Sequence, residues 1–282
     1  STLFPYTTLF RSTNFGAVFR EIPSTILNCE QLGLPKVIAR LAQLPKGLVL
    51  VTGPTGSGKS TTLAAIIDEC NRTRKHHIIT IEDPIEFVHK SQSCIINHRE
   101  LGTHTKSFTA ALRGALREDP DIILVGEMRD LETISLAMEA SMTGHLVFST
   151  LHTMNAMKTV DRVIEIFPAD QQGQVRSTLS DALKAVVSQT LFKRVDVKGR
   201  VAALEILICT PAVRNLIRES KTYQILSAMQ TGKKYGMQTL DDAIEELLSR
   251  HQISAEDAYT NCNDKPRFLK YLRRQPADFT EI

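Results

Sequence analysis

Short apolar runs alternate with longer helical stretches through the middle of the chain. The four runs are residues 48–52, 78–81, 122–125 and 146–150. Runs that are this short and continuously apolar are typical of strands buried on both faces, and parallel strands need helices to connect them. The pattern therefore predicts an α/β fold with a mostly parallel central sheet and helices on both faces.

The pattern differs toward the two ends of the chain. Residues 16–20 alternate like a strand, and residues 31–44 carry apolar positions at helical spacing. Residues 171–190 predict one long amphipathic helix, and residues 201–208 predict a lone strand that precedes three more short helices. The apolar face of the long helix would consist of Val175, Leu179, Leu183, Val186 and Val187.

Segments with different patterns follow one another along the chain. We expect residues 13–33 to be the remnant of an N-terminal domain with its linker, residues 34–209 the α/β core, and residues 210–282 a helical C-terminal part. Residues 1–12, STLFPYTTLFRS, back-translate to a widely used short-read sequencing adapter. We therefore expect this segment to be translated adapter, with natural sequence missing before Thr13.

Composition narrows the class of protein further. With 42% apolar and 23% charged residues, the chain has the balance of a globular protein, and it contains no run of 18 apolar residues that could span a bilayer. A net charge of +3 is too small to indicate a nucleic-acid carrier, so we expect no nucleic-acid partner. Single cysteines without a CxxC pair argue against a zinc site and a disulfide framework, and they favour a cytoplasmic location. These cysteines are Cys29, Cys70, Cys94, Cys209 and Cys262.

A phosphate-binding loop follows the first buried run. The sequence GPTGSGKS fits the pattern GxxxxGK[ST] and lies between an apolar run and a helical stretch, as the motif requires. We expect Lys59 to contact the β- and γ-phosphates of ATP, Ser60 to bind Mg²⁺, and Thr61 to bond the α-phosphate. The expected phosphate cradle consists of Gly53, Pro54, Thr55, Gly56, Ser57, Gly58, Lys59, Ser60 and Thr61.

Three further polar residues follow buried runs and should meet this loop. Glu82, Glu127 and His152 each come at or just after the carboxyl end of a predicted strand, and ligands of open α/β sheets bind outside those ends. We assign Glu127 to the metal ion and Glu82 to the attacking water, although the spacing also permits the reverse assignment. His145 and His152 bracket one strand, so we expect one of the two to meet phosphate and favour His152. Lys59, Glu82, Glu127 and His152 form the expected catalytic set.

Four motifs resemble those of the secretion and pilus motor ATPases. GPTGSGKST (53–61), TIEDPIEFVH (80–89), DPDIILVGEMRDLET (119–133) and GHLVFSTLHT (144–153) are similar to the Walker A, Asp box, Walker B and His box of that superfamily. AVRNLIRE (212–219) resembles AIRNLIRE, the C-terminal signature of the type IV pilus retraction ATPases, the PilT family. The resemblance covers about residues 16–258, and the tail after Tyr259 departs from it.

The resemblance implies a RecA-like P-loop ATPase that forms a homohexamer. It implies a cytoplasmic location at the inner-membrane base of the pilus machine, without a transmembrane segment, and an inner-membrane platform protein as partner. It also implies a PAS-like N-terminal domain, largely missing here, and a motor that powers retraction by removing pilin subunits. Arg20 resembles an arginine that reaches a neighbouring nucleotide, and Arg113, Arg117 and Arg129 are weaker candidates for this role.

The AVRNLIRE segment is predicted to couple hydrolysis to the pilus. At helical spacing Val213, Leu216 and Ile217 form one apolar face, and Arg214 and Arg218 point outward together with Asn215. We expect the coupling residues to be Arg214, Leu216, Ile217 and Arg218.

Three alternative functions differ in recognisable ways. Many pilus-extension and type II secretion ATPases carry a tetracysteine zinc element after the His box, where this chain has only Cys209 and Cys262. A non-hydrolysing accessory subunit would be expected to lose Lys59, Glu82 or Glu127, and all three are present. A RecA-like nucleic-acid translocase is disfavoured by the near-neutral charge.

Overall fold

The computed structural model describes Ile22 and residues 25–272. The expected adapter segment, the expected strand at residues 16–20 and Arg20 lie outside the described residues. Within the described part, a seven-stranded sheet has the order β3-β2-β4-β5-β1-β6-β7. The strands are β1 Gly47–Thr52, β2 His77–Glu82, β3 Ile95–Glu100, β4 Ile122–Val125, β5 Leu146–Leu151, β6 Leu183–Lys193 and β7 Arg200–Ile208. All neighbouring pairs are parallel except β6 and β7, so the predicted parallel sheet is confirmed.

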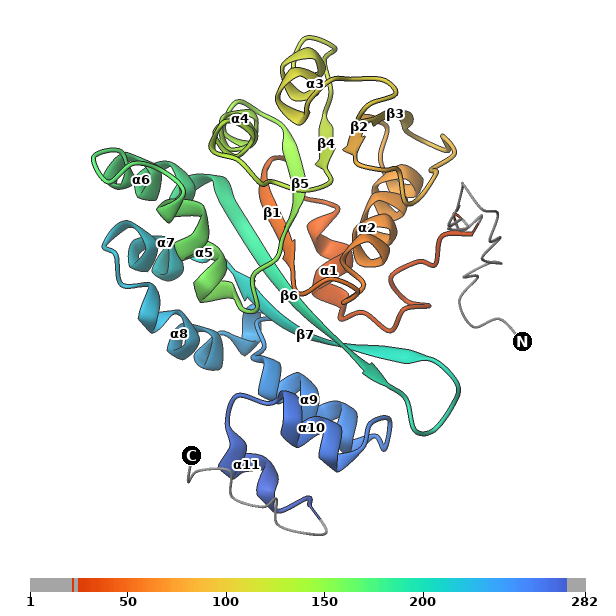
Figure 1. Cartoon of the computed structure of the whole chain (residues 1–282), viewed down its shortest axis with the longest axis vertical. Helices are drawn as coiled ribbons and strands as arrows, with labels where there is room; N and C mark the ends of the chain where they lie inside the picture. The colour runs from red at the N-terminus through yellow and green to blue at the C-terminus, as the bar shows by residue number, and fades with distance from the viewer. Residues whose placement is uncertain (1–21, 23–24, 273–282) are drawn as a thin grey trace, which may run out of the picture.

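Helices cover both faces of the sheet (Figure 1). The residues of β1 explain why, because Leu48 and Leu50 enter one core while Val49 and Val51 enter the other. One face carries α1 Lys36–Leu41 and α2 Lys59–Thr73. The opposite face carries α3 Phe108–Ala115, α4 Leu131–Met142, α5 Ala156–Glu165, α6 Gln172–Ala182, α7 Pro211–Arg218 and α8 Ile225–Thr231.

A third core lies at the lower end of the molecule in Figure 1. There the far part of the β6–β7 hairpin packs against three C-terminal helices through Phe192 and Ala203. The helices are α9 Leu240–Ser249, α10 Ala255–Asn261 and α11 Lys265–Leu269. α11 belongs to the tail after Tyr259, and its Phe268 is fully buried in this core.

The long helix expected at residues 171–190 was wrong in its second half. The helix α6 ends at Ala182, and the remaining residues form β6, which pairs with β1 and β7. Val186 and Val187 fit a helical face by spacing, but β-branched residues also suit a buried strand, and pairing with β1 decides between the two. The strand at residues 201–208 is therefore β7 in a hairpin and not a lone strand.

Other elements also differ from expectation. α1 begins only after Pro35, because proline restricts the residue before it and supplies no backbone N–H. β3 was missed, since its exposed and polar residues lack the apolar signal of the other strands. The described C-terminal residues form five short α-helices after residue 210 rather than three.

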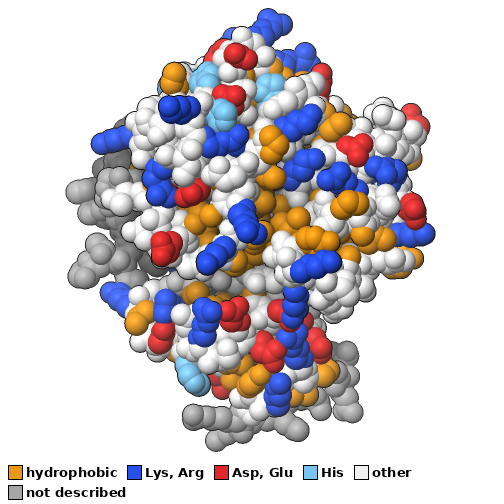
Figure 2. All heavy atoms as spheres, turned by 180° about the vertical axis from the view of Figure 1, so that it is seen from behind, with side chains coloured by type: hydrophobic (Ala, Val, Ile, Leu, Met, Phe, Trp, Pro, Cys, Tyr) orange, Lys and Arg blue, Asp and Glu red, His pale blue; other side chains and the backbone are white. Residues whose placement is uncertain are grey.

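The surface charges, the cysteines and the helices of the described part can be compared with the composition. On the face seen in Figure 2, basic and acidic side chains are interspersed around a band of hydrophobic side chains. Each of the five cysteines lies in the described part and is buried with a free thiol. Among the described residues, no helix combines the length and the apolar character that crossing a bilayer requires.

Candidate functional site

The phosphate loop connects β1 to α2 at the carboxyl edge of the sheet. Gly53, Gly56 and Gly58 have φ values of 139°, 77° and 90°, which favour glycine. A Cβ atom at Gly58 would lie 2.7 Å from Nε2 of Gln189, so a side chain would also lack room there. Gly58 precedes α2 without any side-chain cap. The first N–H groups of α2 are therefore directed at the loop, where they can bind an anion.

Lys59 lies inside this loop. Its Nζ donates hydrogen bonds to the carbonyl oxygens of Gly53 at 3.0 Å and Pro54 at 3.1 Å, and burial lowers the pKa of its ammonium group. An ammonium that is hydrogen-bonded to two neutral carbonyls gains from the approach of phosphate oxygens. Ser57 is buried nearby, and its hydroxyl has no hydrogen-bond partner among the described residues.

The two carboxylates at this edge have opposite environments. Glu127 Oε2 accepts a hydrogen bond of 2.7 Å from Arg129, and His152 Nε2 lies 3.1 Å from Glu127 Oε1. The guanidinium of Arg129 holds the pKa of Glu127 below its ordinary value. Burial instead raises the pKa of Glu82, whose Oε1 has no hydrogen-bond partner in the described part of the chain. Glu127 is therefore suited to bind a cation, and Glu82 is suited to accept a proton.

A cavity of about 680 Å³ brings these groups together. Its size suits a nucleotide-sized ligand. It is lined by most of the residues predicted for the site. These are Thr55, Gly56, Gly58, Lys59, Ser60, Thr61, Glu82, Glu127 and His152.

Two of the additional candidates lie away from this cavity. His145, the less favoured of the two histidines that bracket β5, sits at the opposite end of the strand from the cavity, where its Nδ1 is 2.9 Å from the carbonyl oxygen of Ala140. Arg113 pairs with Glu132 at 2.7 Å on the surface and does not line the cavity.

The other arginines have different outcomes. Arg117 does not line the cavity either, since it lies beyond the end of α3. Arg129 does line it and binds Glu127. Within a single subunit, Arg129 is therefore the arginine of this set that faces the site.

The sequence did not reveal Gln189 on β6. This amide is 4% exposed; its Nε2 donates to the carbonyl oxygen of Ser57, and its Oε1 accepts from the hydroxyl of Thr62, both at 2.7 Å. It thereby fastens the loop to α2 from the neighbouring strand. Its polar side chain within an apolar stretch could have revealed it. The helical spacing instead placed Gln189 in the helix expected at residues 171–190.

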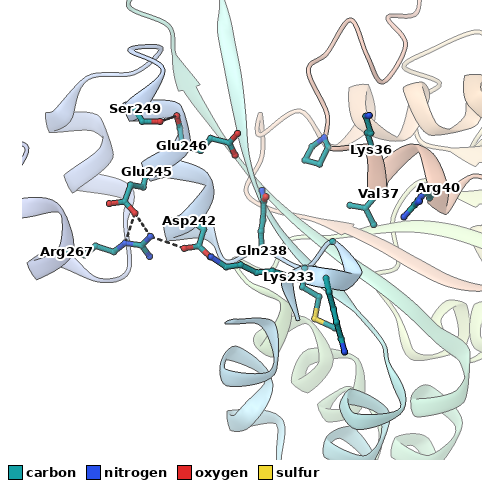
Figure 3. A pocket seen from close by; sticks show the side chains of 14 residues that line it. Lys36, Val37, Arg40, Lys233, Gln238, Asp242, Glu245, Glu246, Ser249 and Arg267 are labelled. Atoms are coloured by element: carbon teal, nitrogen blue, oxygen red, sulfur yellow. Dashed lines mark hydrogen bonds and ion pairs between the residues drawn. The ribbon is translucent and has the colours of Figure 1, made fainter. Parts of the chain in front are cut away.

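A larger cavity of about 770 Å³ lies elsewhere, between α1 and α9 (Figure 3). Lys36 and Arg40 form one wall, and acidic residues of α9 form the other. Arg267 of α11 already pairs with Glu245 and Asp242 there. Because no phosphate loop reaches this cavity, size alone does not identify the chemical site.

The AVRNLIRE segment is more firmly anchored than predicted. Val213 and Ile217 are fully buried and Leu216 is partly buried, as expected. Arg214, which was expected to point outward, is half-buried. Its Nε donates to the carbonyl oxygen of Cys209, which follows β7, at 3.2 Å. Arg218 is exposed but bonds the hydroxyl of Ser180 at 3.0 Å and Asp181 at 3.2 Å.

Comparisons with known proteins agree with this geometry. A family model described as type II/IV secretion system protein matches residues 17–210. The type IV pilus retraction ATPase PilT of Pseudomonas aeruginosa is 61% identical over 243 residues, which are 86% of this chain and 70% of that relative. A twitching motility protein of Neisseria gonorrhoeae is 60% identical over 242 residues, which are 86% of this chain and 65% of that relative.

A solved structure gives the same result. The crystal structure of the pilus retraction motor PilT with bound ADP matches this chain with a TM-score of 0.83 at 50% identity, over 90% of this chain and 71% of that one. This chain thus spans between 65% and 71% of the length of these three proteins. Because the family model covers more than half of the chain and sequence, fold and motifs agree, the chain belongs to the type II/IV secretion system protein family and, within it, to the pilus retraction ATPases.

Proposed function

We propose that this chain is an ATP-hydrolysing motor subunit that powers retraction of type IV pili. The observation that carries the proposal is the phosphate loop with two oppositely tuned carboxylates at one sheet edge. Catalysis of phosphoryl transfer needs neutralised charge, a positioned water and a fixed phosphate chain. Lys59 and the first turn of α2 hold the phosphates, Glu82 accepts the proton of the attacking water, and His152 contacts the γ-phosphate.

The proposed cofactor is Mg²⁺, bound together with ATP. The described residues contain no cluster of three or more His, Cys, Asp and Glu side chains that could hold a metal alone. That agrees with Mg²⁺, which keeps several waters and uses one or two protein ligands beside the phosphates. Ser60 and Glu127 line the cavity and are the groups that would hold it. The ion would neutralise phosphate charge when bound, and Arg129 keeps Glu127 ionised to hold it.

The wider assembly belongs to the same proposal. The motor acts as a cytoplasmic homohexamer at the inner-membrane base of the pilus machine, where it contacts a platform protein. The relatives named for pilus retraction and twitching motility support this assignment. α7 transmits the movement to the pilus through the AVRNLIRE segment.

Phosphate release measures the proposed chemistry directly. Glu82→Gln should keep ATP binding but lower turnover at least about 100-fold, since a general base contributes that much or more. Lys59→Ala should weaken binding and turnover together. Hydrolysis by Glu82→Gln at the wild-type rate would remove the role of Glu82, and absence of hydrolysis by wild-type protein would remove the proposed function.

Retraction itself needs a test in cells. In a chimera, residues 25–272 would replace the matched segment of the Pseudomonas aeruginosa relative in a strain that lacks it. We expect twitching motility to return with this chimera and to stay absent with its Lys59→Ala form. A chimera that is expressed and hydrolyses ATP but supports only pilus extension would favour the alternative motor class.

A further inference from the structure

Glu205 is a buried carboxylate on β7 that contacts the first turns of two helices. Its side chain is 4% exposed. Oε1 accepts a hydrogen bond of 2.7 Å from the backbone N–H of Ala156, the first residue of α5. The backbone N–H of Leu240, the first residue of α9, acts on the same carboxylate and lowers its pKa. Helices begin with unpaired N–H groups and a partial positive charge, so one anion serves both helices.

α5 is joined directly to the catalytic edge. The N-cap of α5 is Asn155, three residues after His152, whose Nε2 lies 3.1 Å from Glu127. Thr153, which follows His152, bonds the hydroxyl of Thr159 on α5 at 2.7 Å. The His152 segment is thus fastened to the first turn of α5.

α9 is fastened at the same point of β7. Gln238, two residues before α9, exchanges backbone hydrogen bonds of 2.9 and 3.1 Å with Ile206. Its side chain donates to the carbonyl oxygen of Leu204 at 2.7 Å. Glu205 lies between Leu204 and Ile206. The start of α5 is therefore bound at the same point of β7 as the segment that leads into α9.

Packing alone would not require a charge at this position. Burial raises the pKa of Glu205, and the charge of Asp241 raises it further. The backbone N–H groups of the two helices lower it. Buried charges are often replaced by apolar side chains without loss of stability. The carboxylate is therefore better explained by the two helices that it joins than by packing.

We propose that Glu205 is a positioning residue that ties the His152 segment to the C-terminal helices through the first turns of α5 and α9. A change at the nucleotide edge that moves His152 then also moves α9. The effect on turnover rests on the proposed ATPase function, whereas the link between the two helices does not.

The first measurement compares two buried carboxylates. In Glu205→Gln the amide N–H₂ cannot accept a hydrogen bond, so either the bond from Ala156 or the contact with the N–H of Leu240 is lost. We expect kcat to fall about tenfold, with the dissociation constant of ADP within about twofold of wild type. The matched control is Asp241→Asn. Asp241 is 8% exposed and accepts hydrogen bonds from the backbones of Asn263 and Asp264, whereas Glu205 accepts one from α5. This variant should lose stability and keep kcat.

The second measurement follows hydrogen exchange of the backbone amides with ADP bound. Glu205→Gln should speed exchange at the first turns of α5 and α9 together, and Asp241→Asn should leave α5 unchanged. If Glu205→Gln does not fold, Glu205→Asp takes its place, because it keeps the charge but shortens the reach by one methylene.

The outcomes separate the two proposals. An unchanged exchange rate at either first turn would overturn the link made by Glu205, whether or not the protein hydrolyses ATP. With active wild-type protein, an unchanged kcat, or an equal loss of kcat and ADP affinity, would overturn the positioning role. Failure of wild-type protein to hydrolyse ATP would count against the proposed function alone.

Discussion

Two glutamates at one sheet edge differ because of their immediate neighbours. Glu127 is bound by Arg129 and His152, while Glu82 lies in a largely buried position, where one of its oxygens accepts no hydrogen bond from the described residues. The neighbours lower the pKa of Glu127, and burial raises that of Glu82. The sequence left open which of the two activates water. The raised pKa favours Glu82, because a general base works best with a pKa near the working pH.

The pH dependence of turnover follows from this difference. The base must be ionised, so kcat should fall as the pH drops through the raised pKa of Glu82, above the range where an ordinary glutamate titrates. Glu127 remains ionised throughout that range because its pKa is lowered. A pH–rate profile with saturating ATP measures this acid limb. A profile that stays flat down to the ordinary glutamate range would contradict the assignment.

At the scale of elements, β6 supports the phosphate loop from the side. Gln189 satisfies both ends of its amide with Ser57 and Thr62, and the lack of room at Gly58 brings the loop close to the strand. The loop is therefore held by a strand that is distant in sequence, since Gln189 and Ser57 are 132 residues apart.

Replacing this amide should weaken nucleotide binding. Gln189→Leu leaves the carbonyl of Ser57 and the hydroxyl of Thr62 without partners, and each lost buried hydrogen bond costs about 1–3 kcal/mol. We expect ADP affinity to fall at least about tenfold, measured by calorimetry. Thr190→Val, the next position on β6, should leave ADP affinity near wild type. Equal affinity in Gln189→Leu would show that the loop does not need this support.

α7 provides a second prediction at this scale. Arg218 is exposed, so Arg218→Ala should cost only about 0–1 kcal/mol of stability and should spare ATPase activity. We expect the chimera that carries it to lose twitching motility. Asp181→Ala breaks the same ion pair while keeping the arginine, so it should retain motility. Loss of motility in both variants would mean that the ion pair matters, and motility in both would remove the coupling role.

At the scale of the whole molecule, the described residues combine three cores around one sheet. Two cores lie on the faces of the sheet, and the third joins the C-terminal helices to the β6–β7 hairpin. The phosphate loop, the carboxylates and His152 come from strands in the middle of the sheet, so ligand binding should stabilise the fold as a unit. In the described part, the C-terminal helices connect to that edge through β7 and Glu205.

Ligand binding should therefore raise the melting temperature. At ADP and Mg²⁺ concentrations of about 100 times Kd, the stabilisation is about 2.7 kcal/mol, which for a chain of this size is a shift of about 5–10 °C. Differential scanning fluorimetry measures it. Lys59→Ala should abolish the shift, and a chelator should reduce it if the metal contributes. An ADP-induced shift that Lys59→Ala leaves intact would place the nucleotide elsewhere.

The sequence by itself determined the parallel sheet, the phosphate loop and the polar residues at the carboxyl edge. Strands buried on both faces are continuously apolar, and the loop is a local motif, so both can be read from neighbouring residues. The same motifs carried the resemblance to the pilus retraction ATPases, which the comparisons confirm.

Tertiary structure decided what depends on residues far apart in the chain. Residues 183–190 fit a helix by spacing, and only pairing with β1 makes them a strand. The support of the loop by Gln189, the opposite environments of Glu82 and Glu127, and the contact of Glu205 with two helices depend on elements brought together by folding. Periodicity reports which face of an element is buried, but it carries no information about which distant side chain will meet it there.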